Sequence, residues 1–419
     1  MFQEAKEDEE GNIVSCKMHD LVHDLAQSVA GVECFRIERA RDEEVAQPPT
    51  ITIPEGVRHV ALLDHGGYNS TNGIEFWSQL KLSNKVRTLV HLSHDYYFGR
   101  FPIERLMSLR VLDLHEKTVE SLQISSIGEL KHLRYLDLSY NLDIETLPTS
   151  ITKLQNLQTM KVRNCEVEKL PEDIGNMKSL RLVDLSWNWT IKALPASTTK
   201  LENLHTLNLS SCHLEELPED IGKLENLHTL GLGDCILENF PVYLRTLTKI
   251  KRIKGLGLPA KHIKELHGLH QHLSGTLSIG RVEQMRDGKE ANLKEMPYLS
   301  GLELIWNNST YGKEIDDNKA VEGEENVLEG LQPHPNLKEL KLRGYGGMKF
   351  ASWMIKSSLL PNLVTIVLED CPRCESLEFS GPLPSLEALW LSKFISLKSI
   401  TRSIDDSWHM AHVERATKL

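Results

Sequence analysis

The sequence predicts an α/β solenoid, in which short parallel strands stack into one sheet and a return segment follows each strand. The first observation behind this prediction is a pattern that recurs five times between residues 127 and 241, I-G-x-L-x-x-L-x-x-L-x-L-x-x-C/N followed by L-P. Its prolines recur every 23 or 24 residues, at Pro148, Pro171, Pro195, Pro218 and Pro241. One unit of such a period cannot bury its apolar face alone, so only stacked neighbours form a core.

The second observation is the extent of the repeat. Alignment of the central strand residue of each unit gives about fourteen units, at Val60, Leu89, Leu112, Leu136, Met160, Val183, Leu207, Leu230, Ile253, Leu277, Leu302, Leu340, Ile366 and Leu389. Lys254-Gly255 interrupts the pattern directly after Ile253. This period and pattern are those of leucine-rich repeats, and we predict a leucine-rich-repeat horseshoe with a parallel β-sheet on its concave face.

The third observation is a recurrent small residue three positions after the last strand leucine. Asn141 and Asn188 hold this position in two units, and cysteines hold it in four others, at Cys165, Cys212, Cys235 and Cys371. In such repeats a small buried group at this position satisfies backbone groups of the turn. We therefore expect these cysteines to be structural.

Composition and charge restrict the class of partner and the compartment. A net charge of -11 argues against a nucleic-acid or anionic-membrane partner. The first ten residues lack the basic and apolar regions of a signal peptide, and no later run approaches ~18 apolar residues. We expect a soluble cytoplasmic protein with no membrane span.

In chain order, residues 10–31 are expected to form a turn, a strand and a helix. Val14, Cys16 and Met18 alternate with polar residues, as in a half-buried strand. Asp20 is placed to cap a helix, because apolar residues recur after it with helical spacing, and Gly31 can end that helix.

The residues Met18-His19-Asp20, within C-K-M-H-D-L-V-H-D-L-A-Q-S-V-A-G, resemble the MHD motif of plant intracellular NB-LRR (NB-ARC leucine-rich-repeat) disease resistance proteins. The resemblance continues upstream through residues 2–4 and 11–12 and downstream into the repeats. It implies that residues 1–32 are the end of the NB-ARC winged-helix subdomain and that the chain is a C-terminal fragment. In that family the histidine senses ADP, so by resemblance His19 is the sensor, Asp20 its partner and Met18 the third member of the motif.

The nucleotide site is incomplete in this sequence. No G-x-x-x-x-G-K-[ST] is present, so the chain has no loop to cradle phosphates and no lysine to reach them. ADP and ATP, the cofactors of the full-length family, are expected to bind only when the rest of NB-ARC is supplied. We expect no cofactor in this chain and no enzymatic activity.

Two pairs of residues allow a metal interpretation. His19 and His23 stand one helical turn apart, a spacing that can hold zinc, but the zinc proteases have Glu where Asp20 stands and no third ligand is near in the sequence. Cys371 and Cys374 have C-x-x-C spacing without a second pair. We expect His23 to be a partly buried helix histidine and Cys371 to be a cysteine of the ladder, and we expect no metal site.

The remaining boundaries follow from composition. Residues 33–56 are largely polar and include a charged run followed by Gln-Pro-Pro, which indicates a linker. Repeats occupy residues 57–400, and residues 307–329 form an acidic insertion that we expect to be a mobile loop, because so acidic a segment cannot bury itself. Residues 401–419 show no repeat pattern and are expected to be an irregular tail.

The repeat pattern also predicts a binding face. In L-x-x-L-x-L-x the leucines point inward and the intervening side chains point out from the concave face. Aromatic and arginine side chains anchor protein interfaces, although single exposed aromatics are ordinary on any surface. The predicted contacts are Tyr135, Asp137, Lys161, Arg163, Asp184, Trp187, Asn208, Arg252, Glu303, Trp306, Lys341, Arg343 and Trp390.

The repeat subtype adds to the resemblance. The segment after each strand reads L-P-x-x-I-G at residues 170–175 and 217–222, which resembles the cytoplasmic receptors rather than extracellular plant repeats. In those receptors the repeats hold the NB-ARC module inactive and help to recognise a pathogen effector or a guarded host protein. The alternative is a free-standing leucine-rich-repeat scaffold or decoy that binds proteins in trans.

Overall fold

The computed structural model of the chain describes residues 2–7, 13–18, 31–39, 52–64, 84–91, 103–116, 125–235, 237, 249–307, 318–356, 358–379, 383–401 and 409–414. The chain forms two compact units, Met1–Leu207 and Asn208–Leu419, and each is described by itself.

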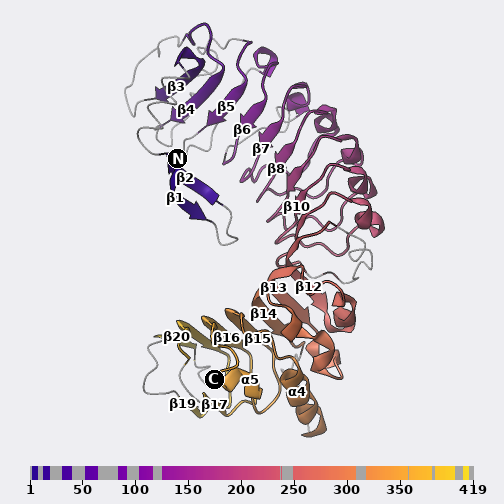
Figure 1. Cartoon of the computed structure of the whole chain (residues 1–419), viewed down its shortest axis with the longest axis vertical. Coiled ribbons are helices and arrows are strands. Elements are labelled where there is room, and N and C mark those ends of the chain that lie inside the picture. Colours follow the sequence, from indigo (N-terminus) through magenta and orange to yellow (C-terminus); the bar gives the residue numbers. More distant parts are fainter. Residues whose placement is uncertain are drawn as a thin grey trace. The chain divides into compact units, whose positions relative to one another are not determined.

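In the first unit, parallel strands lie side by side in chain order (Figure 1). They are β3 (Cys34–Arg39), β4 (His59–Asp64), β5 (Thr88–His91), β6 (Val111–Asp113), β7 (Tyr135–Asp137), β8 (Thr159–Lys161) and β9 (Leu182–Asp184). Leu112 pairs with Leu136, and Leu136 pairs with Met160. The predicted central residues therefore face one another, and the predicted leucine-rich-repeat solenoid with its parallel sheet is confirmed.

The return segments of the first unit include short 3-10 helices, some of which begin directly after a proline. Two of them are η3 (Thr149–Lys153), which follows Pro148, and η5 (Ala196–Lys200), which follows Pro195. Proline suits this position because its fixed φ is compatible with a helix start and its missing N–H would have no partner there. Each of these two segments turns a side chain inward, Ile151 in η3 and Thr198 in η5, and both side chains are buried.

The ladder predicted for the small residues is confirmed. Asn188 is fully buried, and its Nδ2 donates to the carbonyl oxygens of Val162 and Leu185, both at 2.7 Å. Cys165 fills the same place, with its Sγ 3.2 Å from the carbonyl oxygen of Leu138. Burial raises the pKa of the Cys165 thiol to about 12, so it stays protonated at neutral pH.

The second unit continues the same architecture with longer strands (Figure 1). Strand β10 (Thr206–Asn208) contains the boundary, and the later strands in sheet order are β11 (Thr229–Gly231), β12 (Arg252–Pro259), β13 (Leu273–Gly280), β14 (Leu299–Ile305), β15 (Glu339–Arg343), β16 (Thr365–Glu369), β18 (Ala388–Ser392) and β20 (His409–Glu414). Strands β17 (Ser376–Glu378) and β19 (Ser399–Thr401) form a separate parallel pair.

The interruption that the sequence shows after Ile253 is a register shift in β12. Ile253 pairs with Leu273, whereas Leu256 pairs with Leu277, so the ladder shifts between Lys254 and Leu256. Gly255 lies inside this bulge with a φ of 66°. The next pair of strands shifts register too, between Gly275 and Thr276 on β13, and beyond this shift Leu277 lies opposite Leu302 on β14.

The sheet extends beyond the predicted repeat boundaries at both ends. Cys34–Arg39, which we expected to be linker, forms β3 and pairs in parallel with β4. Ile37 is buried and stands two residues after Phe35, so the two apolar side chains have the spacing of a strand. The charged run that follows obscures this pattern in the sequence. In the expected irregular tail, β20 pairs in parallel with β18.

The acidic insertion is partly helical, and the expectation of a mobile loop is wrong for residues 318–330. These residues form α4 (Asn318–Gly330). Glu325 accepts hydrogen bonds from the backbone N–H groups of Met348 and Lys349, at 3.0 and 3.1 Å, and Glu329 accepts one from Ser352 at 2.7 Å. The acidic side chains thus accept hydrogen bonds from the backbone N–H groups at the turn before α5 (Ser352–Ile355). Composition alone could not show this role.

At the N-terminus, β1 (Phe2–Glu7) and β2 (Ile13–Met18) form an antiparallel pair, which confirms the strand predicted before the MHD motif. The helix predicted after Asp20 lies outside the described residues. In the described part of the chain, no helix has the length and apolar character needed to cross a membrane.

Candidate protein-binding surface

The strand register of the first unit brings four of the outward side chains into one row. Asp113 on β6 lies opposite Asp137 on β7, Asp137 lies opposite Lys161 on β8, and Lys161 lies opposite Asp184 on β9. In-register parallel strands stand about 4.8 Å apart, so these side chains are immediate neighbours. Three of the four were predicted as contacts, and Asp113 is an addition that the alignment of the preceding repeat would have supplied.

Asp137 is the centre of a hydrogen-bonded cluster. Its Oδ2 accepts a hydrogen bond from the Tyr135 hydroxyl at 3.0 Å and lies 3.8 Å from Lys161 Nζ, while its Oδ1 accepts one from the Ser139 N–H at 3.0 Å. Lys161 Nζ also lies 5.7 Å from the centre of the Tyr135 ring. Burial and the adjacent Asp137 raise the pKa of Tyr135, which keeps its proton. Asp137 is only 7% exposed, so it positions Tyr135 and Lys161 instead of offering a free carboxylate.

His115 is a second residue that the sequence prediction missed. Its Nδ1 lies 2.7 Å from Asp113 Oδ1, and its backbone N–H donates to the same oxygen at 3.2 Å. The hydrogen bond with Asp113 raises the pKa of His115. A carboxylate–imidazole pair therefore stands at the edge of the row, and its net charge depends on pH.

A left-handed turn residue follows the strand in most repeats, four positions after the central residue. Residues with positive φ at this position are Glu116, Tyr140, Asn164, Trp187, Ser211, Asp234, Arg281, Gly344, Asp370 and Lys393. Trp187 is 38% exposed and packs edge-on against Trp189, with ring centres 5.8 Å apart. Trp187 was predicted as a contact, whereas Trp189 and Tyr140, which stands at the equivalent position two repeats before Trp187, were missed.

The structure contradicts the outward orientation predicted for Trp306. Trp306 is 3% exposed, and its ring meets Tyr345 edge-on at 5.1 Å. It stands at the same repeat position as Trp187, but it lacks the left-handed conformation. The backbone therefore keeps strand alternation from Leu302 through Leu304, and Trp306 continues the inward-facing set.

Two predicted contacts lie near the start of the second unit. Asn208 Oδ1 accepts hydrogen bonds from the Ser210 N–H and hydroxyl, at 3.2 and 2.8 Å, and Asp184 Oδ1 makes the same pair of bonds with Ser186. Asn208 therefore supports a turn. Arg252 is exposed at the first position of β12.

A second row crosses β14, β15, β16 and β18, and its first two side chains are charged. Glu303 pairs in register with Lys341, and Lys341 with Val367, which pairs with Trp390 on β18. Trp390 is 40% exposed. On the adjacent row, Arg343 lies 3.0 Å from Glu369 and 3.9 Å from Glu303.

Glu369 and Lys393 complete this network and were missed by the sequence prediction. Lys393 Nζ lies 3.1 Å from Glu369 Oε1. Hydrogen bonding to Lys393 and the charge of Arg343 lower the pKa of Glu369. Since both partners come from different repeats, only the strand register reveals the network.

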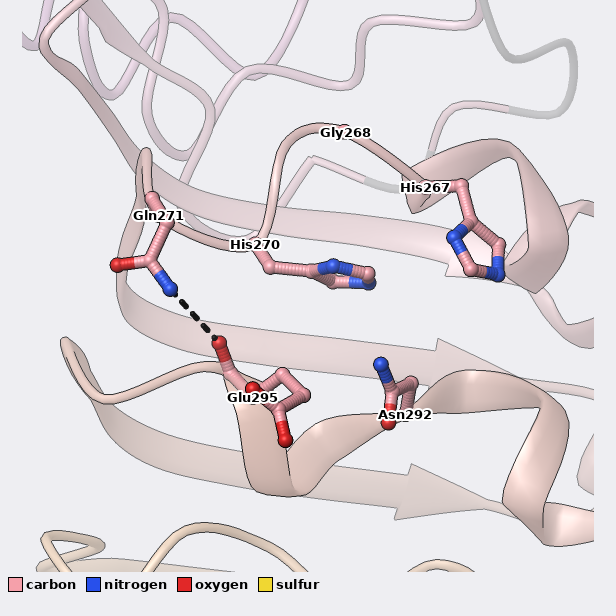
Figure 2. Close-up of a pocket in the computed structure, with 6 residues that line it drawn as sticks. All are labelled: His267, Gly268, His270, Gln271, Asn292 and Glu295. Atoms are coloured by element: carbon pink, nitrogen blue, oxygen red, sulfur yellow. Dashed lines mark hydrogen bonds between the residues drawn. The ribbon is translucent and has the colours of Figure 1, made fainter.

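A shallow pocket of about 450 Å³ lies between the loop before β13 and the turn before β14 (Figure 2). The rings of His267 and His270 meet edge-on, with centres 5.4 Å apart, and Asn292 and Glu295 stand on the opposite wall. Gln271 Nε2 donates to the backbone oxygen of Glu295 at 3.4 Å. Burial lowers the pKa of His270, and the neighbouring His267 lowers it further.

Among the described residues, no group of three or more His, Cys, Asp or Glu side chains is arranged to hold a metal ion. Cys371 and Cys374 are both buried free thiols, and burial raises the pKa of each. Cys374 Sγ lies 3.2 Å from the Gly347 oxygen, which gives it a structural partner. His19, Asp20 and His23 lie outside the described residues, and of Met18 only the backbone position in β2 is described.

Comparison with known families identifies three stretches of repeats. Residues 263–394 match the family described as R13L1/DRL21 LRRs, residues 85–186 match a leucine-rich repeat region, and residues 203–224 match a leucine-rich repeat.

The chain is also similar to plant proteins named for disease resistance. It is 34% identical over 397 residues to one from Arabidopsis thaliana, a match that covers 93% of this chain and 24% of the relative. It is 37% identical over 123 residues to disease resistance protein RGA2 of Solanum bulbocastanum, which covers 29% of this chain and 12% of the relative. The chain thus spans about a quarter or less of these relatives.

Among solved structures, a leucine-rich-repeat protein of Leptospira interrogans is similar, with a TM-score of 0.45 and 19% identity over 79% of this chain and 94% of that one. An internalin of Listeria monocytogenes has a TM-score of 0.43 and 16% identity over 72% of this chain and 82% of that one.

Proposed function

The chain belongs to the plant disease resistance proteins that carry leucine-rich repeats, and on that premise we propose that it acts in plant defence as a protein-recognition surface. The observation that carries the proposal is the ordered row Asp113, Asp137, Lys161 and Asp184 across β6 to β9. Side chains of both charges and an aromatic ring on one sheet face suit a protein partner, whereas a polyanion would be repelled by three carboxylates.

Two partners fit this surface. One is the NB-ARC module, which the repeats would hold inactive in cis. The other is a pathogen effector or the host protein that it modifies. The charged network of the second unit, with Arg343 between Glu303 and Glu369, supports two binding areas, one on each unit.

We also propose that the chain works in the cytoplasm and catalyses no reaction. The plant relatives and the L-P-x-x-I-G subtype support the compartment. Met18, His19 and Asp20 would sense ADP only with the rest of the NB-ARC module present.

The experiment supplies the NB-ARC module as a separate chain and measures its binding to residues 1–419 by interferometry. We expect a complex, and we expect Tyr135→Ala combined with Lys161→Ala to weaken it about tenfold or more, since both side chains stand at the centre of the row.

The matched control is Lys131→Ala combined with Lys153→Ala, which removes exposed side chains from the return segments of the same unit. The control should bind like the wild type. If the wild type does not bind the module, autoinhibition in cis is wrong. If the wild type binds a different protein but not the module, the alternative of a free-standing scaffold is favoured instead.

A further inference from the structure

An exposed aromatic patch follows the ends of β7, β8 and β9 in the first unit, where Figure 1 shows β7 and β8 side by side. We define the aromatic patch as Tyr140, Arg163, Trp187 and Trp189. Its three aromatic side chains are 40%, 38% and 49% exposed, in that order. Exposed tryptophan, tyrosine and arginine side chains are those that most often dominate the energy of protein interfaces.

Backbone hydrogen bonds hold the patch in place. The Tyr140 N–H donates to the Arg163 carbonyl at 2.7 Å, and the Asn164 N–H donates to the Ser186 carbonyl at 2.8 Å. These bonds set Arg163 on the repeat between the one that carries Tyr140 and the one that carries Trp187. Asn188 stands between the two tryptophans in the sequence and is fully buried. Its side chain holds their turn against the preceding repeat by a hydrogen bond to the Val162 carbonyl.

Arg163 is a cation without an anionic partner in the part of the chain that the structure describes. Its guanidinium carbon lies 5.8 Å from the centre of the Tyr140 ring, and its Nε is buried with no hydrogen-bond partner there. The N–H groups of a guanidinium lie in its own plane, so contact of one guanidinium face with an aromatic ring leaves them directed sideways. A carboxylate in that plane can accept two hydrogen bonds from them.

The neighbouring carboxylates are already satisfied within the first unit. Asp137 accepts from Tyr135 and Ser139, and Asp184 accepts from the N–H and hydroxyl of Ser186. Arg163 therefore has donor capacity that its own repeats do not use. The carboxylates around it also disfavour a polyanion, so the complementary group is a single carboxylate on a mainly apolar segment.

The repeat turn fixes the backbone of two patch residues. Tyr140 and Trp187 have φ values of 63° and 64°, in the left-handed region that bulky side chains rarely adopt. Equivalent turns hold Asn164 and Gly344, which adopt this conformation more readily, and Glu116 and Lys393, which do not. The conformation therefore belongs to the repeat, and the side chain at this position is what differs between repeats.

We propose that the aromatic patch binds a segment of a protein partner in which a carboxylate stands beside an apolar side chain. Arg163 pairs with the carboxylate, and Tyr140, Trp187 and Trp189 cover the apolar side chain. This proposal rests on the proposed function of the sheet face as a protein-recognition surface, and it names the chemistry of one part of the partner.

The test uses the 419-residue chain to select binders from a random twelve-residue peptide display library. Selected peptides are then synthesised and titrated by fluorescence polarisation. We expect enrichment of Asp or Glu next to Leu, Phe or Trp. Replacing that acid with its amide in the peptide, and Arg163→Gln in the protein, should each weaken binding about tenfold, and the two changes together should weaken it little further.

Two protein variants keep the test independent of folding. Trp187→Asn replaces the strained tryptophan with a residue suited to the turn, so its unfolding midpoint should equal or exceed that of the wild type while peptide affinity falls. Arg343→Gln, which removes an exposed arginine in the second unit, should leave peptide affinity unchanged.

The outcomes separate this proposal from the general function. If peptide affinity is insensitive to Arg163→Gln but falls with Arg343→Gln or Lys161→Ala, the proposal for the aromatic patch is wrong. The proposed protein-recognition function then still holds. Enrichment of peptides without an acid, or no enrichment, also overturns the patch proposal. Loss of NB-ARC and protein binding in the earlier experiment overturns the general function separately.

Discussion

Trp187 and Asn188 are neighbours in the chain with opposite environments. Trp187 is 38% exposed, whereas Asn188 is fully buried. The left-handed turn at Trp187 separates them, because it directs one side chain to solvent and the next beneath the sheet edge. At the residue scale, each repeat turn therefore has one position open to functional variation and one constrained by backbone hydrogen bonding.

Replacing Asn188 with Ala should lower the free energy of unfolding by about 1–3 kcal/mol, because buried backbone oxygens lose their donor. Val167 N–H, which donates to Asn188 Oδ1 at 3.2 Å, also loses its acceptor. Denaturant titration measures the change. Asn188→Cys is the control, since sister repeats use cysteine, and it should lose less than Ala; a Cys variant less stable than the Ala variant would contradict the ladder.

Two histidines should respond to pH in opposite directions. Asp113 raises the folded-state pKa of His115, so the stability that this pair contributes is present below about pH 6.5 and is lost as pH rises through the raised value. Folding lowers the pKa of His270, so the unfolded chain binds the proton of this histidine more tightly than the folded chain does. Acidification therefore destabilises the fold.

Denaturant titrations of His115→Gln and His270→Gln at pH 5.5 and 8.5 check both signs. Relative to the wild type, His115→Gln should lose more stability at pH 5.5 than at pH 8.5. His270→Gln should gain relative stability as the pH falls. The same direction for both variants would be evidence against the assigned causes.

At the element scale, close approach between backbones determines where strands can shift register. A Cβ at Gly255 would lie 2.5 Å from Gly233 Cα, and the residue has a φ of 66°. The β12 bulge therefore depends on glycine for two reasons, space and conformation. By contrast, α4 depends on its side chains, since Glu325 and Glu329 bond to the turn of the next repeat.

Gly255→Ala should destabilise the chain by about 1–3 kcal/mol, because the new methyl group meets the Gly233 backbone in a strained conformation. Thermal and denaturant unfolding measure this loss. Gly323→Ala is the matched control in α4, where nothing lies within 4 Å of the added Cβ, and it should stabilise the chain by about 0.5–1 kcal/mol. Equal effects of the two changes would show that the bulge does not require glycine.

At the scale of the whole molecule, the proposed binding areas lie on both compact units. The first unit carries the Asp137 cluster and the aromatic patch, and the second carries the Arg343 network. A net charge of -11 accompanies these local basic groups. Partner affinity should therefore depend on where Arg and Lys side chains stand and only weakly on overall charge.

The 419-residue chain by itself should bind neither ADP nor ATP. The sequence has no phosphate-cradling loop, and His19 would contact nucleotide only together with the rest of the NB-ARC module. Calorimetric titration of the isolated chain should give no heat of binding. Micromolar affinity for either nucleotide would refute this expectation, and addition of the separate NB-ARC module provides the positive control.

By itself the sequence determined the repeat architecture, the strand order, the inward leucines and the ladder at positions such as Asn188, because a fixed period repeats the same local chemistry in every unit. The tertiary structure alone decided features that depend on contacts between repeats. The burial of Trp306, the strand at Cys34–Arg39, the capping role of Glu325 and the position of Arg163 beside the Tyr140 ring each depend on a backbone conformation or neighbour that one repeat does not encode. The physical reason is that periodicity specifies which face of a strand is apolar, whereas left-handed turns and the packing of the next repeat decide where each remaining side chain points.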